Sequence, residues 1–411
     1  MDPITNPYTP NAGARPDALV GRDDQLTSFD VLLGRLRVGR TEQSMIITGL
    51  RGVGKTVLLA DFSAKTTAAK WQAIEIEVFK LDDSDFRRRL AQGIRQALLR
   101  MSPPERWRDR ANKAIAVLRS FTITIDPDGA LTAGLNTDAA RGEADNGDLT
   151  MDLTDMLVAL GEAAKEEETG VVFLVDEVQF LTQAQLEGLI TALHKTVQKK
   201  LPITMVAAGL PQIAELAGEA KSYAERLFKF PKIDHLGPDD ARRALTEPAG
   251  DSGVRYDDDA LELCLEVTDG YPYFLQELGY AIWPIARDNV IDRASVERAV
   301  VSYTEKLDGS FFRVRLDRAT ELERAYLRAM AELGPAMQSA GDVARLLNRT
   351  SQQCAPTRST LIQKGLLYTP EYGYAKFTVP HFDQFMRRAI PELVVPELRS
   401  RPRRSGATTS S

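Results

Sequence analysis

The chain has few residues of the kinds that form disulfides or bind metals: two cysteines and three histidines among 411 residues. Cys264 and Cys354 lie in unrelated segments, which argues against a disulfide framework and against a cysteine-based metal site. His194, His235 and His381 are scattered, and no spacing typical of metal ligands links them. We therefore interpret all three histidines as structural.

Long apolar runs are also missing. No stretch approaches the roughly 20 consecutive apolar residues of a membrane-spanning helix. The first ten residues contain neither the basic flank nor the apolar segment of a secretory signal. These absences predict a cytoplasmic protein without membrane contact, while the length predicts two or three domains.

Charge is unevenly distributed along the chain. The formal net charge is −6, yet residues 311–411 hold 16 Lys/Arg against 9 Asp/Glu. A basic C-terminal end permits contact with a polyanion, although surface charge often serves solubility alone.

A glycine-rich motif at 49–56 reads Gly-Leu-Arg-Gly-Val-Gly-Lys-Thr, which is the spacing of a phosphate-binding loop. An apolar run at 45–47 precedes it and a helical pattern at 57–60 follows it. The glycines let backbone N–H groups converge on phosphate oxygens, Lys55 reaches the β- and γ-phosphates, and Thr56 offers a hydroxyl to Mg²⁺. The motif predicts binding of a nucleoside triphosphate. The residues expected to contact it here are Gly49, Arg51, Gly52, Val53, Gly54, Lys55, Thr56 and Val57.

A second motif, which ends in two acidic residues, completes the predicted catalytic site. Residues 171–177 form an apolar strand that ends in Asp176 and Glu177. Asp176, together with Thr56, is expected to hold Mg²⁺, and Glu177 to activate the attacking water as general base. With Lys55, this pair predicts hydrolysis in addition to binding.

Strand and helix patterns alternate up to about residue 236, which is typical of a parallel sheet covered on both faces. Strands are expected at 44–48, 73–79, 171–175, 203–208 and 227–230. Residues 238–310 are expected to be helical throughout. The consecutive arginines Arg87, Arg88 and Arg89 are interpreted as solvated.

One segment interrupts the alternation. Residues 121–126 alternate apolar and polar side chains before Pro127-Asp128-Gly129, which predicts a hairpin, followed by a loose acidic linker at 136–148. A flap over the sheet edge and a contact site for a partner protein or for DNA, at 119–137, are both open.

Together these motifs resemble the AAA+ ATPases, within the branch of origin-recognition initiators and signal-transducing STAND ATPases. The resemblance covers about residues 16–300, and its carriers are Val20-Gly21-Arg22, residues 49–56, 173–177 and 223–228, and Gly270-Tyr271-Pro272. It implies an α/β fold: a P-loop AAA+ parallel-sheet core with a helical lid, using ATP and Mg²⁺. It further implies that Val20 and Gly21 line the adenine pocket and that the lid closes over the nucleotide through Pro272.

The resemblance also implies a homo-oligomer, in which Arg226 is the arginine finger that one subunit donates to its neighbour. An ordinary surface arginine is the alternative. Two segments depart from the pattern: Ala207-Ala208-Gly209-Leu210, where a polar residue senses the γ-phosphate, and Tyr271-Pro272-Tyr273-Phe274, where initiators carry an arginine. Slow, switch-like hydrolysis is therefore expected.

Residues 318–390 have the order helix, helix, turn, helix and hairpin, which resembles a winged-helix domain. The third helix, 351–364, would then enter the major groove of duplex DNA. The residues expected to contact DNA are Arg349, Ser351, Gln352, Gln353, Thr357, Arg358 and Lys376. Winged helices also serve as protein-interaction modules, so both readings stay open.

The expected domains are an extended arm (1–19), the nucleotide-binding core (20–237, with an insertion at about 119–150), the lid (238–312), the winged helix (313–395) and a disordered basic tail (396–411). The predicted function is a Mg²⁺-dependent ATPase whose nucleotide state controls oligomerisation and DNA binding. The alternative is a STAND-type signalling or defence switch, in which the winged helix is a protein-interaction or autoinhibitory module.

Overall fold

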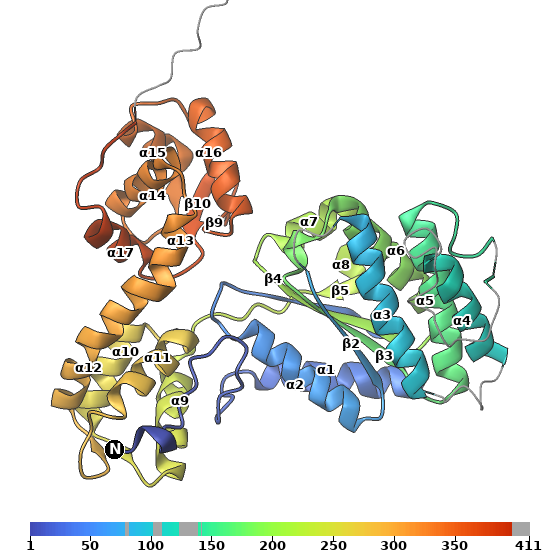
Figure 1. Cartoon of the computed structure of the whole chain (residues 1–411), viewed down its shortest axis with the longest axis horizontal. Helices are drawn as coiled ribbons and strands as arrows, with labels where there is room; N and C mark the ends of the chain where they lie inside the picture. The colour runs from blue at the N-terminus through green and yellow to red at the C-terminus, as the bar shows by residue number, and fades with distance from the viewer. Residues whose placement is uncertain (79–81, 102–108, 123–138, 141, 397–411) are drawn as a thin grey trace, which may run out of the picture. The chain divides into compact units, whose positions relative to one another are not determined.

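The computed structural model describes residues 1–78, 82–101, 109–122, 139–140 and 142–396. They divide between two compact units, the first ending at Tyr303 and the second beginning at Thr304 (Figure 1). The predicted tail, from 397 onward, lies outside the described residues. Within the described part of the chain, no helix combines the length and the hydropathy needed to cross a membrane.

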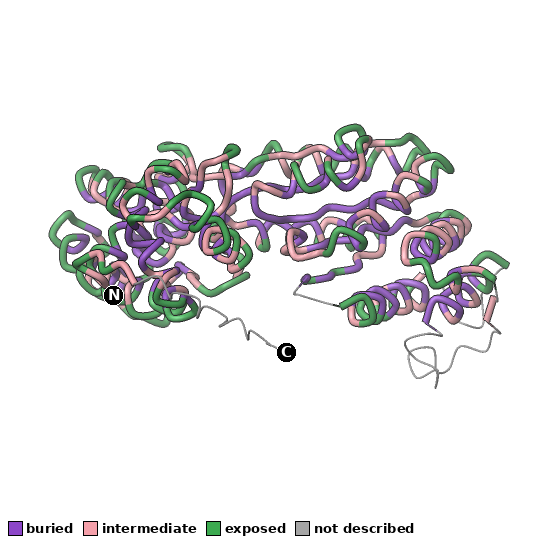
Figure 2. Tube along the Cα trace, turned by 90° about the horizontal axis from the view of Figure 1, so that it is seen from above, coloured by how far each residue is buried: buried purple, intermediate pink, exposed green. Residues whose placement is uncertain are grey.

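The first unit is built on a five-stranded parallel sheet with the strand order β2-β3-β4-β1-β5. Its strands lie within one or two residues of the predicted positions: β1 (Ser44–Thr48), β2 (Gln72–Glu77), β3 (Val171–Asp176), β4 (Ile203–Gly209) and β5 (Phe228–Lys229). Every residue of β1 and β4 is buried, as expected for central strands covered on both faces. Figure 2 shows the strands as a buried layer between helices. The α/β fold predicted from the sequence is confirmed.

Helices cover both faces of the sheet. One face carries α1 (Asp23–Arg37) and α2 (Lys55–Ala68), which Phe29 and Phe62 join by ring stacking at 4.4 Å between centroids. The other carries most of the apolar core, with α3 (Asp83–Met101), α5 (Leu149–Glu166), α6 (Gln183–Gln198), α7 (Ile213–Ala220) and α8 (Ala224–Leu227). Helix α4 (Asp109–Thr122) packs on α3 and α5. The segments that carry the glycine-rich and acidic motifs therefore follow strands of a buried sheet.

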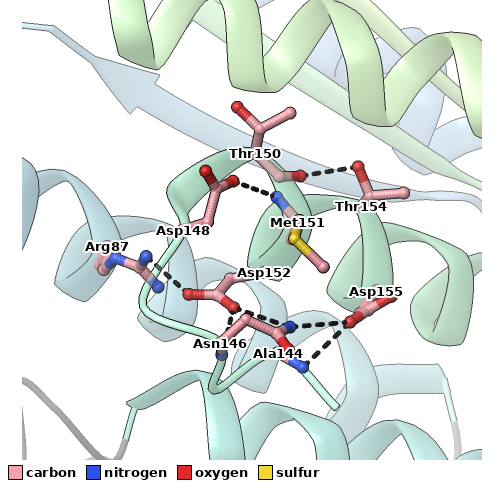
Figure 3. A network of polar contacts seen from close by, with 9 residues as sticks. All are labelled: Arg87, Ala144, Asn146, Asp148, Thr150, Met151, Asp152, Thr154 and Asp155. Carbon is pink, nitrogen blue, oxygen red and sulfur yellow. Dashed lines mark hydrogen bonds and ion pairs between the residues drawn. The ribbon is translucent and has the colours of Figure 1, made fainter. Parts of the chain in front are cut away.

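The insertion differs from its prediction. Phe121 and Thr122 end helix α4, so the expected strand does not begin there, and residues 123–138 lie outside the described residues. Phe121 is fully buried in the core, which its helical position explains. The expected loose linker is also tied down: Ala144 N–H donates to Asp155, and Asp148 caps α5 by accepting from the Met151 N–H (Figure 3).

The prediction that Arg87 is solvated was wrong. Its guanidinium donates to Asp152 at 2.7 Å, and both residues are buried, at 8% and 1% exposure (Figure 3). Asp152 also accepts from the Asn146 N–H, and the Arg87 guanidinium lies 5.0 Å from the Phe121 ring centroid. The insertion covers this face of α3, so the arginine is buried together with its partner. Arg88 remains at the surface, paired with Asp85.

The remainder of the first unit contains four helices: α9 (Pro238–Asp251), α10 (Asp258–Thr268), α11 (Pro272–Ile282) and α12 (Arg293–Lys306), the last continuing into the second unit. The prediction of helices only was wrong in one detail, because β6 (Arg255–Tyr256) and β7 (Val290–Ile291) form a short parallel pair. Two residues per strand are too few for a period-two pattern to be read from the sequence.

The N-terminal arm is packed against these helices. After a 3₁₀ turn, η1 (Pro3–Thr5), the Tyr8 ring is buried against Gly279, where a Cβ would lie 2.7 Å from the ring. The Tyr8 hydroxyl is 2.6 Å from the Leu245 carbonyl and 2.7 Å from the Tyr256 hydroxyl. Further along the arm, Arg15 pairs with Asp61 of α2 at 2.8 Å.

The second unit begins within the last turn of α12 and continues with the π-helix η5 (Leu307–Phe312) and α13 (Arg313–Asp317). Its body comprises α14 (Glu321–Leu333), β8 (Gln338–Ser339), α15 (Ala340–Leu346), α16 (Ser351–Gln363), β9 (Leu367–Tyr368), β10 (Tyr374–Phe377) and α17 (Phe382–Ala389). The strands form an antiparallel sheet in the order β8-β10-β9. The third helix expected at 351–364 corresponds to α16, and β9 and β10 form the expected hairpin.

Candidate active site

The glycine-rich loop joins β1 to α2. Gly52 (φ 81°) and Gly54 (φ 93°) adopt left-handed backbone conformations, which glycine permits at no steric cost. Lys55 is the first residue of α2 and only 6% exposed, and its Nζ donates to the carbonyls of Gly49 (3.0 Å) and Leu50 (2.7 Å). Burial lowers the pKa of Lys55 to about 8, although the carboxylates of Glu177 and Asp176 oppose the shift.

The loop and the acidic end of β3 meet at the carboxyl edge of the sheet. The Thr56 hydroxyl donates to Oδ2 of Asp176 at 2.6 Å, and Oδ1 accepts from the Glu177 N–H at 2.8 Å. Burial raises the pKa of Asp176, and these two hydrogen bonds oppose that shift. Lys55, Thr56, Asp176 and Glu177 are thus brought together, as predicted from their motifs.

These oxygens fit a magnesium ion. Mg²⁺ is usually bound by one or two protein oxygens, with phosphate and water completing its octahedron. The adjacent Thr56 hydroxyl and Asp176 carboxylate offer such a pair. Among the described residues no group of three or more His, Cys, Asp or Glu side chains could hold a metal, so a fully protein-built cage is absent there.

Glu177 leaves the strand in a left-handed conformation (φ 54°) and caps a short 3₁₀ turn, η4 (Val178–Phe180). Its Oε2 accepts a hydrogen bond from Gln179 Nε2. Gln179 was not among the predicted site residues. The available signal was its position two residues after the predicted base, but the sequence does not say where its side chain points.

The start of α11 contacts the loop. The Tyr273 N–H donates to the Gly52 carbonyl at 3.2 Å, and a Cβ on Gly52 would lie 3.0 Å from the fully buried Tyr271 ring. Pro272, the first residue of α11, lies between these tyrosines and is half-buried. The predicted lid segment and the phosphate-binding loop are therefore in direct contact.

The segment before α1 contacts the loop as well. Arg22 is buried and donates to the carbonyls of Val53 (2.9 Å) and Asp234 (3.1 Å). Burial lowers the pKa of Arg22, although nearby Asp240 and Asp234 oppose the shift. Gly21 has φ 67°, a left-handed conformation that favours glycine, and a Cβ there would lie 2.7 Å from Asp240 Oδ2. Val20, which is buried, and Gly21 were predicted site residues. The hydrogen bonds by which Arg22 links the loop to Asp234 were not predicted.

Arg226 lies near the amino-terminal ends of the strands, whereas the phosphate-binding loop follows a carboxyl end. It is exposed on α8, two residues before Phe228, which pairs in register with Ser44 at the start of β1. Parallel strands rise about 3.3 Å per residue, so the loop after Thr48 is roughly 13 Å further along. Within the described part of the chain the Arg226 guanidinium has no hydrogen bond or ion pair. The sheet register therefore places Arg226 away from its own subunit's loop.

The residues predicted to contact DNA lie on the second unit in two groups. Ser351 and Gln352 are exposed in the first turn of α16, whereas Thr357 and Lys376 are half-buried. The other three make contacts within the unit, as follows: Arg349 donates to the Pro396 carbonyl (2.8 Å), Arg358 donates to the Tyr374 carbonyl (2.6 Å), and Gln353 closes a capping box with Thr350. The sequence alone did not reveal these internal bonds.

Comparisons with known proteins agree with this geometry. The AAA ATPase domain family matches residues 18–206, a segment that contains the loop, Asp176 and Glu177. A family described as a domain of unknown function (DUF8462) matches residues 309–386. A comparison with curated proteins found no match.

Among solved structures, the chain is similar to the Walker-type ATPase PABY2304 of Pyrococcus abyssi. The TM-score is 0.57 at 15% identity, covering 91% of this chain and 97% of that chain. Lower similarity, with TM-scores of 0.44 and 0.45, relates it to two further proteins. These are the Aeropyrum pernix ORC1 protein in complex with DNA (15% identity; 91% and 94% covered) and the Thermotoga maritima RuvB Holliday junction branch migration motor (16% identity; 88% and 95% covered).

At 15% identity the likeness to the Pyrococcus ATPase concerns the fold alone. The family match and the parallel sheet nevertheless agree with each other and with the sequence motifs. The AAA+ part of the predicted resemblance is confirmed: residues 18–206 match the AAA ATPase domain family, and the five-stranded parallel sheet has the fold of P-loop AAA+ ATPases.

Proposed function

We propose that this chain is a Mg²⁺-dependent ATPase in which the bound nucleotide acts as a switch. The observation that carries the proposal is the 2.6 Å hydrogen bond between Thr56 and Asp176, which places both expected magnesium ligands side by side. Magnesium would neutralise charge developing on the β- and γ-phosphate oxygens. Lys55 binds those phosphates, and Glu177 accepts a proton from the attacking water.

Slow turnover is part of the proposal. Ala207, Ala208 and Gly209 close β4 without a polar side chain, and Tyr271 and Tyr273 contact the loop where initiators carry an arginine. Fewer charges to stabilise the transition state favour a long-lived nucleotide complex. The Tyr273–Gly52 hydrogen bond gives the lid a direct contact with the loop, so that nucleotide binding and lid position can influence each other.

The Glu177→Gln variant tests this function. The amide keeps the shape of the side chain but cannot accept the proton, so ATP binding should persist while turnover falls on the order of 10²-fold or more. Equilibrium binding of labelled ATP and release of phosphate measure the two quantities. Parental turnover in Glu177→Gln would show that Glu177 is not the base.

DNA binding by the second unit is a second candidate function. The order α14, β8, α15, α16, β9, β10 resembles that of a winged helix, and Ser351 and Gln352 are exposed at the start of its third helix. Against it, the guanidinium groups of Arg349 and Arg358 are already bonded within the unit, which leaves Lys376 as the remaining cation among the residues predicted to contact DNA. The alternative, a STAND-type switch in which this unit contacts protein, needs no such cations.

Fluorescence anisotropy with duplex DNA separates the two candidates. DNA binding predicts an affinity that falls with added salt, differs between ATP and ADP, and weakens in Gln352→Ala. Gln363→Ala, at the exposed other end of α16, is the matched control. Negligible binding that does not respond to salt in either nucleotide state would favour the protein-interaction module.

A further inference from the structure

A side chain from another segment occupies the space beside the last residue of β4. Gly209 carries no side chain, and the space beside it is occupied by Gln179 from the turn after β3. A Cβ on Gly209 would lie 2.8 Å from Gln179 Oε1 and 2.9 Å from Val178 Cγ1. The glycine thus makes room for the glutamine at the place where β3 and β4 run side by side.

The orientation of the Gln179 amide follows from its neighbours. The Leu210 backbone N–H lies 3.1 Å from Oε1, and since an N–H can only donate, the amide must present its oxygen there. The NH₂ group therefore faces Glu177 and donates to its Oε2. The half-buried glutamine links the predicted base to the backbone that follows β4.

We propose that Gln179 is a positioning residue for Glu177, and that it couples the carboxylate to the segment leading into α7. This inference rests on the proposed ATPase function. With Oε2 engaged by the amide, Oε1 is left to accept the proton of the attacking water. Because Gln179 is itself anchored on the Leu210 N–H, a shift at the end of β4 would reorient the carboxylate.

This arrangement gives the end of β4 an influence on hydrolysis although Ala207, Ala208 and Gly209 cannot hydrogen-bond through side chains. The polar group is supplied by the neighbouring strand. Misplacing a catalytic group by about 1 Å can cost on the order of a hundredfold in rate, so a positioning contact of this kind is worth measuring.

Gln179→Met tests the proposal, because methionine is similar in length but donates no hydrogen bond. We expect the turnover number for ATP to fall about ten- to a hundredfold, with the dissociation constant of a non-hydrolysable ATP analogue unchanged within about twofold. Gln183→Met is the matched control: Gln183 is exposed, and its only described bond is to Glu187 on the same helix. It should hydrolyse ATP at the parental rate.

Gly209→Ala disturbs the contact between Gln179 and Glu177 without changing either residue, since its methyl group displaces the Gln179 side chain. It should lower turnover as Gln179→Met does, and the double variant should be no slower than either single one. Equal melting temperatures show that the variants fold. Parental or faster turnover in Gln179→Met would overturn the proposal, as would fully additive losses in the double variant.

The two proposals fail in different ways. If Glu177→Gln hydrolyses ATP normally, the proposed catalytic base is wrong. If Glu177→Gln is inactive while Gln179→Met is not impaired, the ATPase assignment stands and only the role of Gln179 is rejected.

Discussion

The hydroxyl of Thr56 donates a 2.6 Å hydrogen bond to Oδ2 of Asp176, although 120 positions separate the two residues along the chain. The contact exists because β1 and β3 are both parallel strands that end at the same edge of the sheet. One strand end contributes the phosphate-binding loop and the other the acidic motif. The geometry of the proposed active site therefore depends on the sheet topology as much as on either motif.

Asp176→Asn should weaken magnesium binding. The amide retains a group beside Thr56 but removes the negative charge, so the Mg²⁺ concentration needed to support ATP-analogue binding should rise about ten- to a hundredfold. Titration with Mg²⁺ at fixed analogue measures this. Asp85→Asn, an exposed carboxylate on α3, is the control, and equal Mg²⁺ dependence in both variants would contradict the assignment.

Nucleotide affinity should depend on pH through Lys55. Burial lowers the pKa of this ammonium to about 8, and triphosphate binding favours the protonated form. Affinity should therefore be full below pH 8 and fall above it, by at most about tenfold per pH unit for one linked proton. Isothermal titration between pH 7 and 9.5 measures the slope and the proton uptake.

Lys55→Arg is the control for this pH dependence, because arginine stays protonated over the whole range. Its weaker binding should be nearly independent of pH. A parental slope in Lys55→Arg would assign the titration to another group.

The sequence predicts local features of this protein well. The loop at 49–56 can be recognised in the sequence because phosphate binding needs particular residue types at fixed spacing. Strands β1 and β4 can be recognised because both are short apolar runs. Hydrophobic periodicity and turn residues are properties of neighbouring positions, so they can be read from a single sequence without knowing how distant segments pack.

Contacts between distant segments could not be predicted in this way. Gln179 reaches the N–H of Leu210, 31 positions later, and Tyr8 reaches Tyr256, 248 positions later. Arg87 looks like a solvated arginine until α4 and the insertion cover its helix face. Each case depends on which element packs against which, and one residue pattern is compatible with several such packings.

Arg226 should act only across a subunit interface, because it lies at the edge of the sheet opposite its own loop. ATP turnover per molecule should rise with protein concentration, and Arg226→Ala should lose that rise, about 10³-fold or more if the arginine stabilises the transition state. Mixing Arg226→Ala with Lys55→Ala should restore activity, because one variant keeps an intact site and the other keeps the arginine. The exposed Arg37 provides the control variant. Activity independent of concentration and unchanged by Arg226→Ala would make it an ordinary surface residue.

Breaking the buried ion pair of Arg87 and Asp152 should lower the free energy of unfolding substantially. Removing one partner leaves an uncompensated charge in the core, so Asp152→Ala should lower the free energy of unfolding by about 3–5 kcal/mol. Asp85→Ala removes the partner of the exposed Arg88 on the same helix and should cost about 0–1 kcal/mol. Urea denaturation of both variants measures the difference, and similar costs would mean that the buried pair is solvated in solution.

The N-terminal arm should contribute to stability through one aromatic anchor. Tyr8 is 1% exposed, stacks edge-on against Trp283 at 6.2 Å between centroids, and bonds to the Leu245 carbonyl. Truncating a buried aromatic ring costs about 3–5 kcal/mol, so Tyr8→Ala should lower the free energy of unfolding by that amount. Tyr8→Phe, which keeps the ring but leaves the carbonyl without the hydroxyl, should cost about 1–3 kcal/mol.

Ile4 offers a control within the same arm, because it is 91% exposed. Ile4→Ala should change the free energy of unfolding by no more than about 0.5 kcal/mol. Limited proteolysis adds a local readout: cleavage before residue 20 should accelerate in Tyr8→Ala and stay at the parental rate in Ile4→Ala. If both variants were cleaved alike and equally stable, the arm would not be anchored by Tyr8, and its packing against α9 and α11 would have to depend on the backbone bonds of its first residues.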